Sequence, residues 1–196
     1  MKKQVVVIHG GDTFETYEKY LNFLRGYKID IERYKSDKSD WKLWLRRILG
    51  SGYEIILPIM PNKTNAQFGE WKIWFEKIIP FLYDVVTLVG HSLGGTFLAK
   101  YLSENKFPRK INGVFLVAAV YDNHKQEYSL ASFALPEKLS LQTENIYLYH
   151  SRDDLLVPLT AIEQYKQALP KAKMMVFENR GHFNQEEFPE LAEDIL

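Results

Sequence analysis

The chain has 196 residues, a formal net charge of +0 and a pI of about 7.0. Hydrophobic residues make up 46% and charged residues 26%, which is typical of a single globular domain with a substantial core. The balanced charge argues against nucleic-acid binding, and the lack of cysteine excludes disulfides and thiolate chemistry and fits a cytoplasmic protein. No stretch is long and apolar enough for a membrane span, and the N-terminal apolar run is too short for a signal peptide.

In chain order, apolar strand-like runs alternate with helical patterns, which predicts a parallel sheet with helices on both faces. The expected strands are Val5–Ile8, Tyr53–Leu57, Val85–Val89, Val114–Ala118, Ile146–Tyr149 and Lys173–Phe177. The expected helices are Trp41–Leu49, Gln67–Phe81, Leu93–Asn105, Leu159–Leu169 and Glu186–Ile195. We expect one domain over residues 1–196, with six mostly parallel strands and a minimal cap.

Two stretches interrupt this alternation. Residues 14–40 form an insertion whose first half reads as an extra helix, with Asp12 as its N-cap and Gly26 as its stop. Residues 121–140 form a long connection that is expected to cover a pocket. Phe133 and Leu135 in this connection are candidate substrate-binding residues.

The most informative motif is Gly90-His91-Ser92-Leu93-Gly94, which matches the G-x-S-x-G pattern of a nucleophile elbow. An apolar, β-branched run precedes it and a helical pattern follows, so Ser92 is predicted to lie on a sharp strand-to-helix turn. A serine in that position is a candidate nucleophile, provided that a base takes its proton.

The candidate base is His182, because it follows the last expected strand and precedes the last expected helix. In α/β-hydrolases the triad follows the chain order Ser, Asp, His, which His150 does not satisfy. Asp154 is the preferred acid because it lies four residues before Pro158, and its neighbour Asp153 is the alternative. His9 and His91 are interpreted as structural, and His124 as a solvated loop residue.

An acyl-transfer site also needs two preorganised N–H donors for the oxyanion. The backbone of Leu93, directly after the nucleophile, is predicted to supply one. The loop after the first strand is expected to supply the other, and Gly11 is the candidate in it.

These motifs resemble the α/β-hydrolases, and in particular the small serine hydrolases related to the retinoblastoma-binding-protein hydrolases. The resemblance covers roughly residues 4–196. Its motifs are His9-Gly10-Gly11, Trp44-Leu45, Pro58 with Met60-Pro61-Asn62, Trp74, the elbow, Asp153-Asp154 with Val157-Pro158, and Gly181-His182-Phe183. The chain departs from that family at Phe14–Asp40, which is inserted directly after the predicted oxyanion loop. We therefore expect the insertion to wall or cover the pocket.

The resemblance implies a cofactor-independent enzyme that hydrolyses carboxylic esters, or related acyl bonds, of a small substrate. Amide or thioester cleavage and acyl transfer by the same triad remain alternatives, as does a catalytically silent protein-binding module. The tryptophan-bearing helices could also lie on a membrane surface, although packing on the sheet is favoured. No metal-binding or phosphate-loop motif is present, and the sequence leaves both a monomer and a homodimer open.

Overall fold

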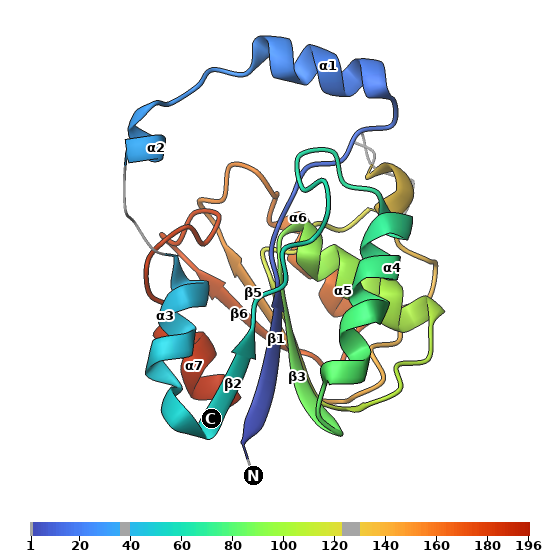
Figure 1. The fold of residues 1–196 in the computed structure, drawn as a ribbon, viewed down its shortest axis with the longest axis vertical. Coiled ribbons are helices and arrows are strands. Elements are labelled where there is room, and N and C mark those ends of the chain that lie inside the picture. Colours follow the sequence, from blue (N-terminus) through green and yellow to red (C-terminus); the bar gives the residue numbers. More distant parts are fainter. Residues whose placement is uncertain (1, 36–39, 123–129) are drawn as a thin grey trace.

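The computed structural model describes residues 2–35, 40–122 and 130–196. Its centre is a six-stranded sheet in the order β2-β1-β3-β4-β5-β6, in which every neighbouring pair is parallel (Figure 1). The strands are β1 (Lys3–Ile8), β2 (Tyr53–Ile56), β3 (Val85–His91), β4 (Lys110–Val117), β5 (Ile146–Ser151) and β6 (Lys173–Phe177). The predicted parallel sheet is confirmed.

Helices cover both faces of this sheet. They are α1 (Tyr17–Gly26), α2 (Glu32–Lys35), α3 (Trp41–Ile48), α4 (Phe68–Ile78), α5 (Leu93–Glu104), α6 (Thr160–Ala168) and α7 (Pro189–Ile195), with short 3₁₀ turns at Gly50–Gly52, Ile79–Phe81 and Ala131–Phe133. Helices α3 and α7 pack on one face, while α4, α5 and α6 pack on the other. Helices α4 and α7 differ most from the predicted ranges, because Pro80 breaks the end of α4 and Pro189 begins α7, and the other three predicted helices agree to within one residue at each end.

The run of apolar residues in β1 follows from burial on both faces. Val6 and Ile8 point into the core under α4 and α5, while Val5 and Val7 point into the core under α3. Because side chains on both faces of β1 are buried, polar and apolar residues do not alternate along Val5–Ile8, and all four residues are Val or Ile.

The register brings the loops that follow the strands to one edge of the sheet. Ile8 at the end of β1 pairs with Gly90 in β3, and His91 at the end of β3 pairs with Val117 at the end of β4. The ends of β5 and β6 are also level, since Ser151 pairs with Phe177. The loops after β1, β3, β5 and β6 therefore start together, and they hold the predicted site residues.

The insertion does not join either helix layer. Residues 14–35, which we call the arch, carry α1 and α2 past the edge where the strands end, and α1 stands apart from the sheet (Figure 1). The predicted N-cap of α1 was wrong, because Thr16 caps the helix by accepting a hydrogen bond from the N–H of Lys19. Asp12 is held instead in the loop after β1, where its N–H donates to the carbonyl of Lys63 at 2.8 Å.

The connection over residues 121–140 is described only in part, and His124 lies outside the described residues. Phe133 is fully buried and packs edge-on against Phe68 and Trp71, and Leu135 belongs to the same core. These two side chains therefore expose little surface to a ligand, and their role in substrate binding stays a prediction.

Candidate active site

Ser92 lies at the tight turn between β3 and α5. Its backbone has a φ of 53° and a ψ of −125°, which is unusual for a residue other than glycine. The turn is held by the Ser92 N–H, which donates to the carbonyl of Val117 at 2.8 Å. A Cβ on Gly94 would lie 2.4 Å from the carbonyl oxygen of Ile8, so only glycine lets the start of α5 approach β1 this closely. The glycines of the motif thus support a strained serine at the edge of the sheet.

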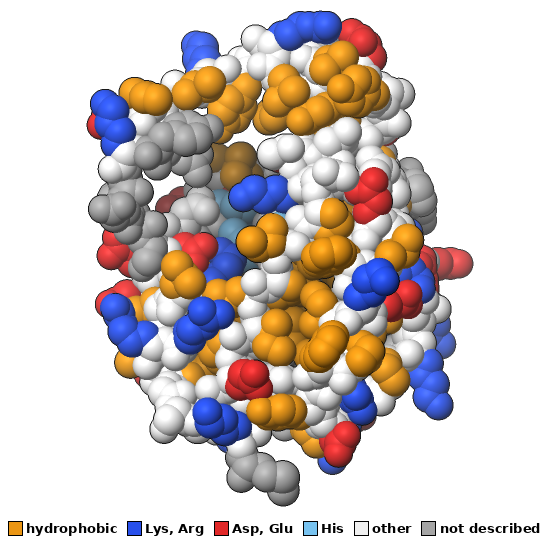
Figure 2. Space-filling model, in the orientation of Figure 1, with side chains coloured by type: hydrophobic (Ala, Val, Ile, Leu, Met, Phe, Trp, Pro, Cys, Tyr) orange, Lys and Arg blue, Asp and Glu red, His pale blue; other side chains and the backbone are white. Residues whose placement is uncertain are grey.

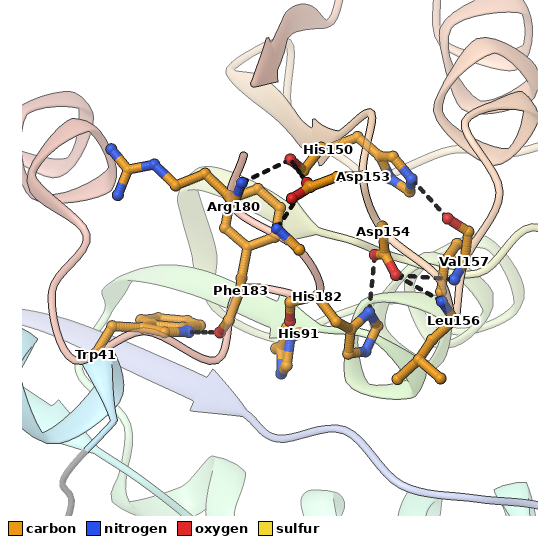
Figure 3. Close-up of polar contacts among 12 residues, drawn as sticks. Trp41, His91, His150, Asp153, Asp154, Leu156, Val157, Arg180, His182 and Phe183 are labelled. Carbon is orange, nitrogen blue, oxygen red and sulfur yellow. Dashed lines mark hydrogen bonds and ion pairs between the residues drawn. The ribbon is translucent and has the colours of Figure 1, made fainter. Parts of the chain in front are cut away.

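The predicted base and acid are hydrogen-bonded to each other. His182 Nδ1 and Asp154 Oδ2 are 2.8 Å apart, and the Asp154 side chain is completely buried (Figure 3). The other oxygen of Asp154 accepts the backbone N–H groups of Leu156 and Val157 at 2.9 and 3.1 Å. Burial alone would raise the pKa of Asp154, but these hydrogen bonds outweigh it and hold the pKa below its usual value. The group facing His182 is therefore a carboxylate at neutral pH.

The two neighbouring aspartates have different contacts. Asp153 Oδ1 accepts the Gly181 N–H at 2.8 Å and the Ser151 hydroxyl at 2.5 Å, which together lower the pKa of its carboxyl group. Asp153 thus binds the backbone of the loop that carries His182, whereas Asp154 contacts the imidazole itself. Of the two candidates, the geometry favours Asp154 as the acid.

The loop around His182 is fixed by side chains from distant parts of the chain. The indole N–H of Trp41, at the start of α3, donates to the Phe183 carbonyl at 2.9 Å. His91 Nε2 donates to the carbonyl of His182 at 2.8 Å, and the N–H of Arg180 donates to the Ser151 hydroxyl at 2.8 Å (Figure 3). This loop is therefore tied to α3, β3 and β5 at once.

His91 and His150 act here as neutral hydrogen-bond donors. Burial, together with the charges of Lys42 and His182, lowers the pKa of His91 to about 3. Burial also lowers the pKa of His150, whose Nε2 donates to the Val157 carbonyl at 3.0 Å in the turn that contains Asp154. The interpretation of His91 as structural agrees with these contacts, but the specific bond to His182 has no signal in the sequence.

The predicted oxyanion loop packs directly against Ser92. A Cβ on Gly10 would lie 3.0 Å from the Ser92 Cβ, and one on Gly11 would lie 2.5 Å from the carbonyl oxygen of Lys63. His9 fixes the loop, because its Nε2 accepts the Met60 N–H at 2.9 Å while its Nδ1 donates to the Gly10 carbonyl at 2.6 Å. Leu93 begins α5, where backbone N–H groups are not used by the helix itself. The geometry is compatible with oxyanion donors at Leu93 and Gly11, and both stay predictions.

Comparison with known proteins identifies the family. The family model described as serine hydrolase matches residues 33–191. The chain belongs to this serine hydrolase family. Over 193 residues it is 24% identical to YdeN of Bacillus subtilis (strain 168), described as a hydrolase, and the match covers 95% of this chain and 89% of that protein.

Solved structures confirm that this hydrolase has the α/β-hydrolase fold. The ydeN gene product of B. subtilis superposes with a TM-score of 0.70 at 19% identity, covering 99% of this chain and 97% of that one. A YdeN-like hydrolase from Pectobacterium atrosepticum gives a TM-score of 0.59 at 16% identity, over 93% and 80% of the two chains. The thioesterase domain from the curacin biosynthetic pathway gives 0.60 at 14% identity, over 100% and 91%.

The described part of this hydrolase offers no group of three or more His, Asp or Glu side chains arranged to hold a metal ion. Within residues 2–35, 40–122 and 130–196, no helix combines the length and apolarity that crossing a bilayer requires. A cavity of about 300 Å³ lies beside the oxyanion loop, between α3 and the segment after β2. Its lining residues are Val7, His9, Asp40, Lys42, Leu43, Leu57, Pro58 and Ile59.

Proposed function

We propose that this serine hydrolase cleaves carboxylic esters through a triad of Ser92, Asp154 and His182. The observation that carries the proposal is the 2.8 Å hydrogen bond between His182 Nδ1 and the buried Asp154 carboxylate. Both residues follow strands that end at the same sheet edge as Ser92. An imidazole oriented by a carboxylate, at the same sheet edge as a serine on a strained turn, supports a site in which the imidazole activates the hydroxyl for attack on an acyl carbon.

The reaction follows from the direction of the imidazole. Because Nδ1 faces Asp154, the free nitrogen for proton transfer is Nε2. Nε2 removes the proton from Ser92 Oγ as this oxygen bonds to the carbonyl carbon, and the N–H groups of Leu93 and Gly11 stabilise the oxyanion. The bond between the acyl carbon and the alcohol oxygen of the ester then breaks as His182 gives its proton to that oxygen. The alcohol leaves, and the acyl group stays on Ser92 as an acyl-serine. A water molecule then attacks the acyl-serine while His182 takes its proton, and His182 returns this proton to Ser92 Oγ as the carboxylic acid leaves.

Asp154 contributes by holding one tautomer and by stabilising the imidazolium that forms during the reaction. The three hydrogen bonds to its carboxylate keep it charged and fix its orientation. The hydrogen bonds from Trp41 and His91 to the backbone at Phe183 and His182 fix the loop that carries the imidazole. The base is thus preorganised, which lowers the reorganisation needed in the transition state.

Labelling with a fluorophosphonate, followed by intact mass, tests the proposal. We expect one adduct on the wild-type protein and none on Ser92→Ala or His182→Ala, because the reagent reports an activated serine. An unlabelled but folded wild-type protein would refute the triad and favour a binding module. A panel of matched ester, thioester and amide substrates then determines the acyl bond, since a triad serves all three chemistries.

A further inference from the structure

The arch turns an apolar face toward the rest of the molecule and touches it at Tyr20, whose hydroxyl lies 3.4 Å from Thr64 Oγ1. Each residue of α1 keeps solvent-accessible surface, although the helix has a marked apolar side. Figure 2 shows orange side chains along the inner side of the arch, charged side chains on its outer side, and a hollow beneath it. An amphipathic helix normally buries its apolar side, so the hollow leaves an apolar surface uncovered.

Aromatic contacts within the arch give this surface a defined shape. Phe14 contacts Phe23 and Tyr20, with ring centroids 5.1 and 5.5 Å apart, and Tyr17 lies 5.9 Å from Tyr20. Tyr17 is nevertheless 67% exposed, and Leu24 is 45% exposed. The rings therefore hold one another in place while offering apolar surface to a ligand.

The residues on either side of the arch contact loops of the proposed site. At its start, the Thr13 hydroxyl donates to the Ala66 carbonyl at 2.8 Å, directly after the oxyanion loop. Beyond its end, Asp40 caps α3 and Trp41 holds the loop of His182. The arch therefore spans the sheet edge that carries the site, because it starts just after the loop that follows β1 and passes over the ends of the strands (Figure 1).

Apolar side chains are also exposed on loops that leave the strand ends at the site. Ile59, in the segment after β2, is 80% exposed and lines the cavity beside His9. Leu155 and Leu156 follow the proposed triad acid and are 97% and 72% exposed. An apolar group of a ligand that covers such side chains gains free energy, because both surfaces leave water.

We propose that the arch forms a subsite for the apolar chain of the ester substrate. The chain lies in the hollow against the aromatic side of α1, while its ester carbonyl is held at Ser92. The ten residues of α1 span about 15 Å, which is comparable with an extended chain of about ten carbons. This inference rests on the proposed function and names its substrate class as esters with a long alkyl chain.

A chain-length series with paired variants tests the subsite. Tyr17→Ser/Leu24→Ser removes apolar surface from α1, and Glu18→Gln/Arg25→Gln is the matched control, because it removes an exposed ion pair from the same helix. We expect kcat/KM for p-nitrophenyl decanoate, below its aggregation concentration, to fall at least about tenfold in the first variant. Activity on p-nitrophenyl acetate, and both activities of the control, should stay within about twofold of wild type.

Decyl acetate distinguishes the two sides of the ester. A selective loss on p-nitrophenyl decanoate places the acyl chain under the arch, and a selective loss on decyl acetate places the alcohol chain there. Equal effects on acetate and decanoate in every variant would overturn the subsite. Activity that rises only once the substrate aggregates would also overturn it and would identify the arch as a lipid-surface anchor.

A binding measurement keeps this inference separate from the proposed chemistry. A fluorescent dodecanoic acid should bind Ser92→Ala, and its Kd should rise at least about tenfold when Tyr17→Ser/Leu24→Ser is added. Absence of binding to Ser92→Ala would overturn the subsite even if the triad labels with fluorophosphonate. Binding without labelling would leave the subsite standing and refute the hydrolytic triad.

Discussion

Replacing Asp154 with asparagine tests the proposed triad most sharply. One carboxylate oxygen of Asp154 already accepts the N–H groups of Leu156 and Val157, so the asparagine oxygen has to occupy that position. The amide nitrogen then faces His182 Nδ1 and donates to it, which places the imidazole proton on Nε2. An imidazole with a proton on Nε2 cannot accept the Ser92 proton, while the size of the side chain is unchanged.

The expected loss in kcat/KM is about 10³- to 10⁴-fold, or roughly 4 to 5.5 kcal/mol of transition-state stabilisation. Asp153→Asn is the matched control, because the asparagine oxygen can still accept the Gly181 N–H and the Ser151 hydroxyl. We expect it to retain activity within about threefold of wild type, since it leaves the tautomer of His182 unchanged. Steady-state ester hydrolysis by both variants, with circular dichroism to verify folding, is the assay. Equal losses, or a larger loss in Asp153→Asn, would refute the assignment of the acid.

Three further predictions follow from the contacts of the site. The pKa of His91 is about 3 in the folded protein against about 6.5 when unfolded, so the unfolded chain binds more protons between these pH values. Stability therefore falls on acidification, by up to roughly 5 kcal/mol for this group. Denaturant melts should show a shallower decline in His91→Gln, whose amide can still donate to the His182 carbonyl, and an unchanged decline would contradict this. Trp41→Phe removes the indole N–H from the Phe183 carbonyl and should cost about 1 to 3 kcal/mol in urea unfolding and reduce kcat, whereas equal kcat would mean that the bond does not position His182. Gly94→Ala places a Cβ 2.4 Å from the Ile8 carbonyl oxygen and should lower the free energy of unfolding by more than about 3 kcal/mol. Gly69→Ala in α4 meets open space and should leave that free energy unchanged or raise it by about 0.5 to 1 kcal/mol. Thermal melts compare the two variants, and similar values would refute the packing argument.

Much of the fold could be predicted because its signals are local. Continuous apolar runs identify the strands, and the glycines around Ser92 identify the turn after β3, where the structure also has a strained serine. The order of strands and helices then restricts the topology to a parallel sheet. The chain order also predicted which loops would bring Asp154 and His182 together.

The remaining features depend on contacts between distant residues. The choice between Asp153 and Asp154 depends on how two consecutive side chains point from one turn, which the spacing to Pro158 indicates only indirectly. The bond from Trp41 to Phe183 joins residues 142 positions apart, and the sequence contains no sign of it. For the arch, the sequence predicted a helix in its first half, but local signals do not say whether that helix packs on the sheet.

The loop that carries His182 depends on residues contributed by β3, α3 and the end of β5. These segments are separated by long stretches of chain, so the hydrogen bonds to Phe183, His182 and Arg180 can form only after the sheet is nearly complete. Partly folded molecules that lack β5 or β6 therefore hold a serine without an oriented base. During refolding, catalytic activity should return after most secondary structure has formed, which makes hydrolysis a reporter of the last tertiary contacts to assemble.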